Sequence, residues 1–425
     1  MNFNNKHKFN DQRRRTLKHM AAGAGALSLA RAGIATAQQD TLKIGVIYPL
    51  SGTIAQLGNN QLAGARVAAE QFNRAGGVLG RKVELVVRDD KASPAESALV
   101  GRELMGAGIK FFVGGLLTAP GMAIVNLLQE NNALFVLTGS QIVALTHENF
   151  NPNAFRATIN GRMNLYAAGS AVPLNNPQIS QWGGITPDNQ FGTDNYRLFS
   201  TALKKTYQSK LGKAVTTADP VLAPFPATDF KVQISRLMSS PIEGLYVGVV
   251  GADFVTFMAQ AKQLGLYNKI KVFVEAGTGV AAARALGANL PKDNMWSPTS
   301  WYPGATNSAV SKALVKDYTE MTKDPLPDNS VYLGHMGMLA MLNTIKNANS
   351  LETPVVRVAL ERVEFESANG PFRFRREDHQ GITNIQVLKL KQKEGDPGWE
   401  VSKVVTVRGE DVIEPPSPGQ KYSET

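Results

Sequence analysis

Short apolar runs alternate along the chain with segments whose apolar residues recur at helical spacing. The first run, LKIGVIY at residues 42–48, is followed by Leu62, Ala65, Ala69 and Phe72, which are three or four positions apart. Residues at these separations share one face of a helix, whereas short runs of β-branched and aromatic residues are typical of buried strands. Further runs of this kind are VELVV (83–87), KFFVGG (110–115) and LFVL (134–137). This alternation predicts a parallel sheet with helices on its faces.

The same alternation restarts in the middle of the chain, which predicts a second sheet. The strand-like runs there are AFRAT (154–158), ISQWGGI (179–185), EGLYVGVV (243–250) and KVFVEA (271–276). Two long helical stretches follow at residues 308–322 and 331–347, and short strands are expected in GPFRFRR (370–376) and IQVLKLKQ (385–392). The Pro-rich end, EPPSPGQKYSET at residues 414–425, predicts a flexible tail.

Composition supports a globular chain with more than one lobe. The 425 residues are 43% hydrophobic, and a typical domain has about 150 residues. The chain has no cysteine, which excludes disulfides, thiol catalysis and cysteine-ligated metals. The formal net charge is +10, but the first 37 residues carry seven Lys and Arg against one Asp. The rest of the chain therefore has only a small positive excess, and a nucleic-acid-binding function loses its main support.

The first 37 residues have the layout of a signal peptide. In QRRRTLKHMAAGAGALSLARAGIATAQQ, a basic stretch is followed by a small, mildly apolar run and by the cleavage-site pattern Ala-Thr-Ala before Gln38. Arg13 and Arg14 resemble the pair of a twin-arginine signal, and Arg31 interrupts the apolar run as that route tolerates. We expect export to the periplasm, with the twin-arginine route favoured over the general one. A disordered basic tail is the alternative.

The best match to an enzyme motif in the sequence is Gly277-x-Gly279-x-x-Ala282, which follows a strand-like run. A dinucleotide-binding fold also needs an acidic residue at the end of the next strand. Asp293 comes too early in the chain for that role. We therefore predict no nucleotide site and no cofactor.

The remaining ionisable residues do not form a catalytic or metal-binding pattern. His147, His335 and His379 lie in separate segments without the paired spacing of metal ligands. Asp89 and Asp90 could act as an acid and base pair, but they end a strand and fit better as caps of the following turn and helix. The sequence predicts no catalytic residue and no metal.

Small hydroxyl residues and glycines recur where the strands of the first half end. They occur in PLSGT, which contains Ser51, in GGLLTAPG, which contains Thr118, and in LTGSQ, which contains Ser140 and Gln141. Ligands of open α/β sheets bind at the carboxyl edge of the strands, where helix N-termini offer free amides to anions. We interpret these segments as one wall of a cleft for a small anionic ligand. Helix capping is the alternative for any one of them.

Several segments together resemble a known family of binding proteins. PLSGTIAQLGNNQLAGARVAAEQFN, NRAGGVLGRKVELVVRDDKASP, FVGGLL, AFRATING, NQFGTDNYRLFSTALK, TDFKVQISRLMSSPIEGLYVGVVGAD and AKQLGL occur in the expected order between about residues 41 and 392. As a set they resemble the branched-chain amino-acid-type periplasmic binding proteins, the type I solute-binding components of ABC importers. The resemblance implies an α/β fold of two Rossmann-like lobes with parallel-rich sheets, joined by three crossovers that let the lobes close on a ligand like a Venus flytrap.

The resemblance also implies lobe boundaries and site residues. Residues 41–157 plus 285–383 would form the N-terminal lobe and residues 158–284 plus 384–413 the C-terminal lobe, with crossovers near Thr158, Arg284 and Thr383. Leu116, Thr118, Gly139 and Ser140 match the carboxylate-binding wall, Leu57 a residue that covers the ligand, and Phe191 a tyrosine of the far lobe. The predicted site comprises Ser51, Leu57, Leu116, Thr118, Gly139, Ser140, Gln141, Phe191, Val250, Glu275 and Tyr302.

Departures from the family pattern bear on the ligand. Val250 stands where amino-acid binders carry another tyrosine, and the glutamate that pairs with an α-ammonium aligns near Gly277 or Thr278, two or three residues after Glu275. Either Glu275 reaches an ammonium by a local shift, or the ligand has none. The sequence favours a hydrophobic or aromatic organic acid, and a branched-chain amino acid remains the alternative.

The resemblance further implies a non-enzymatic, monomeric protein that delivers its ligand to an ABC permease of the inner membrane, without nucleic-acid partners. A soluble sensor, which binds its ligand and then contacts a membrane receptor, would have the same sequence features. It is the alternative interpretation.

Overall fold

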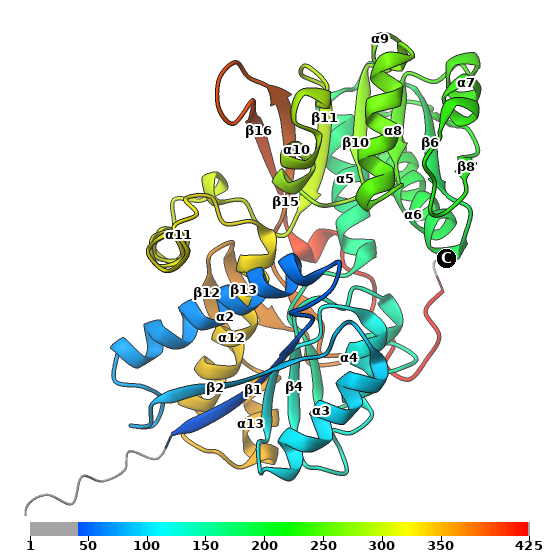
Figure 1. Cartoon of the computed structure of the whole chain (residues 1–425). Coiled ribbons are helices and arrows are strands. Elements are labelled where there is room, and N and C mark those ends of the chain that lie inside the picture. The colour runs from blue at the N-terminus through cyan, green and yellow to red at the C-terminus, as the bar shows by residue number, and fades with distance from the viewer. Residues whose placement is uncertain (1–40, 424–425) are drawn as a thin grey trace, which may run out of the picture.

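The computed structural model describes residues 41–423, so the predicted signal peptide lies outside the described residues. Figure 1 shows a lower lobe around strands β1 to β4 and an upper lobe around strands β6 to β11. Within the described residues, no helix is both long and apolar enough to cross a membrane.

The lower lobe is built on a five-stranded sheet with the order β2-β1-β3-β4-β5, in which all neighbouring strands are parallel. The strands are β1 (Leu42–Tyr48), β2 (Val83–Asp89), β3 (Phe111–Gly114), β4 (Leu134–Leu137) and β5 (Ala154–Arg156). The helices are α2 (Ala55–Arg74), α3 (Pro94–Gly106), α4 (Thr118–Val125), α11 (Ala309–Thr322), α12 (Asn329–Ala348) and α13 (Thr353–Leu360). The predicted alternation of strand and helix is confirmed here.

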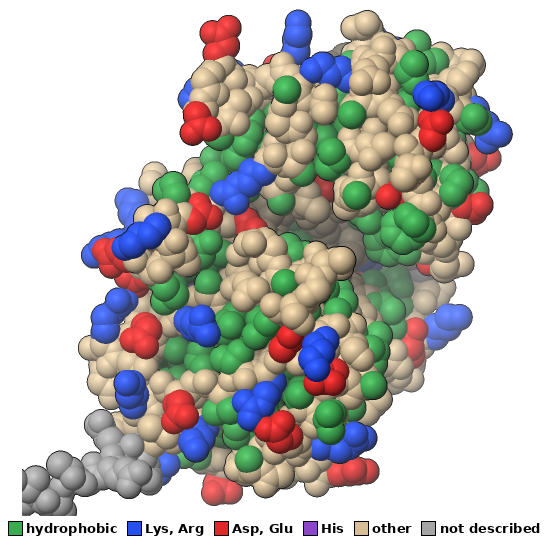
Figure 2. Space-filling view, in the orientation of Figure 1, with side chains coloured by type: hydrophobic (Ala, Val, Ile, Leu, Met, Phe, Trp, Pro, Cys, Tyr) green, Lys and Arg blue, Asp and Glu red, His purple; other side chains and the backbone are tan. Residues whose placement is uncertain are grey.

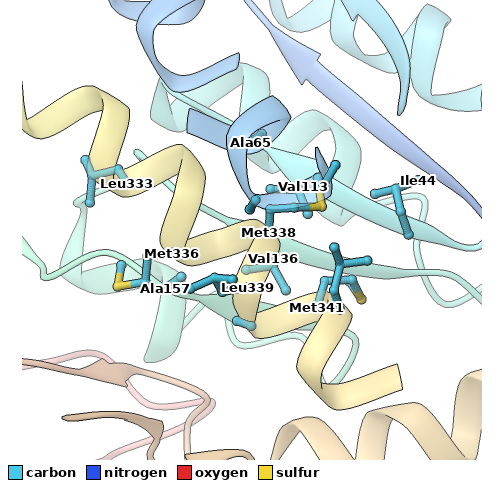
Figure 3. Packing of buried hydrophobic residues seen from close by; sticks show 14 of the residues in the cluster. Ile44, Ala65, Val113, Val136, Ala157, Leu333, Met336, Met338, Leu339 and Met341 are labelled. Atoms are coloured by element: carbon cyan, nitrogen blue, oxygen red, sulfur yellow. The ribbon is translucent and has the colours of Figure 1, made fainter. Parts of the chain in front are cut away.

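Both faces of this sheet are covered, which is why its strands are apolar at nearly every position. On one face Val46, Val113 and Val136 pack against α2 and α12, which contribute residues such as Ala65 and Met338 (Figure 3). The opposite face, with Ile47, Phe112 and Phe135, packs against α3 and α4. Neighbouring residues of a strand point to opposite faces of the sheet, so each short strand contributes side chains to both hydrophobic cores.

The upper lobe contains an eight-stranded mixed sheet with the order β16-β15-β11-β10-β9-β6-β7, and β8 also pairs with β6. Its strands are β6 (Gln181–Pro187), β7 (Thr216–Thr217), β8 (Val221–Ala223), β9 (Gly244–Val247), β10 (Val272–Glu275), β11 (Met295–Thr299), β15 (Ile385–Gln392) and β16 (Trp399–Val407). Strands β6 to β11 run parallel, whereas β15 and β16 are antiparallel additions. The helices are α5 (Gly161–Asn175), α6 (Gln190–Thr206), α7 (Lys231–Ser239), α8 (Gly251–Gln263), α9 (Leu266–Lys269) and α10 (Val280–Leu286). A second sheet is therefore confirmed.

The chain passes from the lower sheet to the upper one after β5, as expected near Thr158. It returns after β11, because β11 pairs with β10 and β15 in the upper sheet. The expected crossover near Arg284 is wrong, since Arg284 lies within α10. The chain then forms a small sheet of β12 (Glu364–Ser367), β13 (Gly370–Phe374) and β14 (Gly381–Ile382) and crosses again before β15, near Thr383.

The tail that was expected to be flexible is attached to the lower lobe over much of its length. The Glu414 side chain is fully buried and accepts hydrogen bonds from Asn160 at 2.6 Å and from His147 at 3.3 Å. Ser417 contacts His147 at 2.6 Å, and the Gly419 amide donates to the His147 carbonyl at 2.7 Å. A Pro-rich composition suggested fraying, but these buried polar contacts hold the segment in place.

Candidate functional site

Each large sheet has a point at which the strand order reverses. In the lower lobe it lies between β1 and β3, and in the upper lobe between β6 and β9. Loops that leave such a point diverge to opposite faces of the sheet, which opens a crevice at the carboxyl ends of the strands. Figure 2 shows the surface hollowed between the two lobes. We place the candidate site in this hollow, between the two reversal points.

The lower wall brings four predicted residues together. A Cβ atom on Gly139 would lie 2.5 Å from Leu116 Cα, so the loops after β3 and β4 touch and only glycine fits at this point. A Cβ atom on Gly121 would lie 2.7 Å from Ser140 Oγ, which places the first turn of α4 against the same loop. Thr118 begins that turn. The sequence prediction that Leu116, Thr118, Gly139 and Ser140 share one wall therefore agrees with the packing.

The main-chain amides of this wall are available to a ligand. Among residues 41–423, none accepts a hydrogen bond from the amides of Thr118, Gly139 or Ser140. The first amides of α4 also carry the positive end of the helix dipole. The Ser140 hydroxyl is not available, because it donates to the carbonyls of Gly115 at 3.1 Å and Leu117 at 3.2 Å. The wall offers amides and the Thr118 hydroxyl, an arrangement suited to a carboxylate.

Ser51 and Leu57 lie on the loop and first turn that follow β1. Burial by itself would raise the pKa of Asp89, but hydrogen bonds from Ser51, Leu50 and Lys91 outweigh it and lower that pKa. Ser51 therefore hydrogen-bonds to the end of β2 and does not cap α2, whose N-cap position, Ile54, makes no side-chain cap hydrogen bond. Leu57 is 42% exposed in the first turn of α2 and leaves an apolar side chain beside the reversal point.

The upper wall carries exposed apolar residues at its own reversal point. Phe191 is 55% exposed in the first turn of α6, which follows β6. Val250 precedes α8 and follows β9. Phe225, which the sequence analysis missed, is 56% exposed two residues after β8, the strand that pairs with β6. The run Pro-Phe-Pro at 224–226 indicates a turn, because proline is typical of turns, but it does not indicate that Phe225 is exposed.

Glu275 ends β10 and is only 3% exposed. Its carboxylate accepts hydrogen bonds from the amides of Gly277 at 3.0 Å and Thr278 at 2.9 Å, and from the hydroxyls of Thr278 at 3.0 Å and Ser297 at 2.5 Å. Burial raises the pKa of Glu275, and these hydrogen bonds act in the opposite direction. The carboxylate thus closes the loop between β10 and α10, and Gly277 and Gly279 wrap around it with φ of +127° and +63°.

Two predicted residues remain, Gln141 in the loop after β4 and Tyr302 after β11. Gln141 is exposed, and its carbonyl accepts a hydrogen bond at 3.0 Å from Gly161, the first residue of α5. Tyr302 is partly buried against the upper core that includes Val401 and Val404. Tyr302 follows β11, which is separated from β9 by β10, so it stands apart from the reversal point.

The histidines have structural partners instead of catalytic ones. His335 contacts Gln71 at 2.9 Å and His379 contacts the Ala154 carbonyl at 3.1 Å. Burial lowers the pKa of each to about 4, so both are neutral at physiological pH. In the part of the chain that the structure describes, no three His, Asp or Glu side chains gather as a metal site would require.

Replacing Thr118 tests the lower wall. A hydrogen bond to a charged group contributes about 1.5 to 3 kcal/mol, so Thr118→Ala is expected to weaken carboxylate binding by roughly tenfold to a hundredfold. Isothermal titration calorimetry measures the affinity, and thermal unfolding confirms that the variant is folded. Wild-type affinity in the folded variant would show that the carboxylate does not bind at this wall.

Comparison with known proteins identifies the family of the chain. The family described as "Periplasmic binding protein" matches residues 41–396. The leucine-, isoleucine-, valine-, threonine- and alanine-binding protein of Pseudomonas aeruginosa is 24% identical over 338 residues, which cover 79% of this chain and 86% of that protein.

Solved structures show the same fold at low identity. The closed form of a leucine-, isoleucine-, valine-, threonine- and alanine-binding protein from Brucella ovis superposes with a TM-score of 0.77 and 18% identity, covering 91% of this chain and 100% of that one. A solute-binding protein of an ABC transporter from Rhodopseudomonas palustris BisB5, solved in complex with 3,4-dihydroxy benzoic acid, gives a TM-score of 0.72 and 17% identity, covering 87% and 98%. Both structures are named as binding proteins, and the second is named as part of an ABC transporter. This chain, with its two α/β lobes and a hollow between them, belongs to the periplasmic binding protein family.

Proposed function

We propose that this protein binds a small hydrophobic or aromatic carboxylate without an α-ammonium group and delivers it to an ABC importer of the inner membrane. The observation that supports the proposal is the hydrogen bonding of the Glu275 carboxylate. Both of its oxygens already accept hydrogen bonds, from Gly277 and Thr278 of the following loop and from Ser297 of β11. These bonds occupy most of the acceptor sites of the Glu275 carboxylate, which leaves little capacity for a ligand ammonium.

The remaining surface of the hollow fits such a ligand. The lower wall supplies amides for the carboxylate, and the upper wall supplies Phe191 and Phe225 as apolar surface. An ammonium buried between these walls without a counter-charge would cost several kcal/mol. The Rhodopseudomonas palustris relative that was solved with a dihydroxy benzoic acid supports this class of ligand.

A branched-chain amino acid is the second candidate, and Asp188 is the observation that favours it. Asp188 is exposed directly after β6, three residues before Phe191, and its carboxylate could replace Glu275 as the partner of an ammonium. The Pseudomonas aeruginosa relative is described as binding branched-chain amino acids.

A thermal-shift screen of the mature chain distinguishes the two candidates. Leucine and isocaproate form a matched pair, because isocaproate is leucine without its amino group, and benzoate and the dihydroxy benzoic acid probe aromatic acids. A site-specific ligand at 100 times its dissociation constant stabilises the folded state by about 2.7 kcal/mol. We expect the amine-free acids to raise the melting temperature more than leucine does. The opposite ranking would favour the amino acid.

Replacing Glu275 gives an independent test of the ligand class. We expect Glu275→Gln to change the affinity for the best amine-free acid by less than about threefold, which is below 0.7 kcal/mol. The paired variant is Asp188→Asn. If leucine binds and either substitution reduces its affinity by more than tenfold, the ligand ammonium is paired and the amine-free proposal is wrong.

Delivery to an importer is tested separately from binding. Deleting the gene is expected to abolish uptake of the radiolabelled ligand by cells, and a copy of the gene should restore it. Unchanged uptake together with a lost transcriptional response to the ligand would favour the sensor.

A further inference from the structure

A buried arginine lies directly behind the lower wall. Arg156 ends β5 and is 1% exposed. Its Nη1 donates to the carbonyl of Ile142 and, at 3.5 Å, to that of Ser140. Its Nη2 donates to Thr146 Oγ1 at 2.9 Å, and its Nε to Gln380 Oε1 at 2.6 Å. One guanidinium therefore holds the loop of residues 140–146 at several points.

These contacts fix the direction of the peptide groups in the wall. In a trans peptide the carbonyl and the following N–H point in opposite directions. Because the Ser140 carbonyl turns toward Arg156, the Gln141 amide turns away from it, to the other side of the loop. Within the described residues, no group accepts a hydrogen bond from the Gln141 amide. Arg156 thus orients an amide donor that has no partner in the protein.

Arg156 also brings a positive charge into the buried interior of the protein. Burial lowers the pKa of Arg156 to about 10, so the side chain stays protonated at neutral pH. Charges in such a region interact over longer distances than charges at the surface, because they are less screened.

The nearest opposite charges compensate Arg156 only in part. The Asp378 carboxylate already forms an ion pair at 2.6 Å with Arg375. Burial by itself would raise the pKa of Glu414, but hydrogen bonds from His147 and Asn160 and the charge of Arg156 outweigh it and bring the pKa to about 2. Glu414 is therefore ionised at neutral pH and is the carboxylate of the tail that faces the same network.

We propose that Arg156 is a positioning residue for carboxylate recognition, which orients the Gln141 amide and adds a positive charge behind it. The negative charge of Glu414, which belongs to the C-terminal segment, partly neutralises Arg156 and so weakens the attraction between Arg156 and a ligand carboxylate. The inference rests on the proposed function, since it requires a ligand carboxylate at the lower wall.

The test compares the affinities of each variant for a carboxylate ligand and for the primary amide of the same acid. The probe is the acid with the largest thermal shift in the screen, and calorimetry gives both affinities. For Arg156→Gln we expect the carboxylate to lose roughly tenfold more affinity than the amide. For Arg156→Lys, which keeps the charge but not the fork of donors, we expect both affinities to fall and their ratio to stay within about threefold of wild type. A residue with a purely structural role would lower both affinities equally in both variants.

Glu414→Gln is a second variant, which tests the same role of Arg156 if Arg156→Gln does not fold. This change removes the compensating negative charge and preserves the shape of the side chain, so the ratio of carboxylate to amide affinity should rise, by about threefold. Arg74→Gln is the matched control, because Arg74 is a surface arginine at the far end of α2, 58% exposed and paired with Asp317. In Arg74→Gln the ratio of carboxylate to amide affinity should equal that of the wild-type protein.

The outcomes separate this inference from the proposed function. If the wild-type protein binds no carboxylate in the screen, the proposed function fails. If the wild-type protein binds one and neither Arg156→Gln nor Glu414→Gln changes the ratio of the two affinities, the role of Arg156 is overturned while the proposed function stands.

Discussion

Gly139→Ala is expected to reduce ligand affinity by at least about a hundredfold, because two or more amide hydrogen bonds to a carboxylate, each contributing about 1.5 to 3 kcal/mol, depend on the position of this loop. The added Cβ atom would lie 2.5 Å from Leu116 Cα and 2.8 Å from the Leu116 carbonyl carbon. These are backbone atoms that cannot rotate away. The two loops must separate, and the amides of Thr118, Gly139 and Ser140 then no longer converge.

The protein should remain folded in this variant. Overpacking typically costs about 1 to 3 kcal/mol, whereas native proteins have a stability of about 5 to 15 kcal/mol. Gly161→Ala is the matched control, because Gly161 bonds to the neighbouring Gln141 but its added Cβ atom would meet only the Gln141 carbonyl oxygen at 3.8 Å. Calorimetry should give wild-type affinity for Gly161→Ala. Tight binding by Gly139→Ala would mean that the ligand does not use this wall.

Gly334→Ala is expected to have the largest effect on stability, a loss of about 3 kcal/mol or more in the free energy of unfolding. Helices α2 and α12 cross with their backbones in contact at two glycines. A Cβ atom on Gly334 would lie 2.6 Å from the Gln61 carbonyl carbon, and one on Gly64 would lie 2.8 Å from that of Val331. Neither helix can move away without opening the core that both form with the lower sheet.

Urea denaturation measures this loss, with the slope expected to stay at the wild-type value. Gly106→Ala is the control, since no heavy atom lies within 4 Å of its added Cβ atom at the end of α3. That variant should be as stable as wild type or more stable by up to about 1 kcal/mol, because alanine favours the helix. If both variants unfold at the same urea concentration, the helices do not meet at Gly334.

Much of the candidate site was predictable because it depends on neighbouring residues and on a general rule. The residues after β3 and β4 were recognised from small hydroxyl residues and glycines at strand ends, and parallel strands bring such ends to one edge. The side-chain roles at those positions were less predictable. Ser140 was predicted to belong to the carboxylate-binding wall, but its hydroxyl donates to the carbonyls of Gly115 and Leu117 and not outward.

Residues whose role depends on distant partners were missed or misplaced. The β11 strand was assigned to the lower lobe because its sequence does not show that its neighbours are β10 and β15. Arg156 gave no signal, since its acceptors at Ser140, Ile142 and Gln380 come from different parts of the chain. The C-terminal tail was predicted to be flexible because the contacts of Glu414 with His147 and Asn160 form only in the folded protein.

The sequence by itself determined that the chain builds two α/β lobes and that small hydroxyl residues and glycines follow the strands at one sheet edge. Periodicity and strand-end composition are local properties, and they are sufficient for those conclusions. Only the tertiary structure decided that Glu275 closes its own loop, that Phe225 joins Phe191 at the upper wall, and that Arg156 stands behind the lower one. The direction of a buried polar side chain is set by which partners satisfy its hydrogen bonds, and those partners are fixed by packing between segments far apart in the sequence.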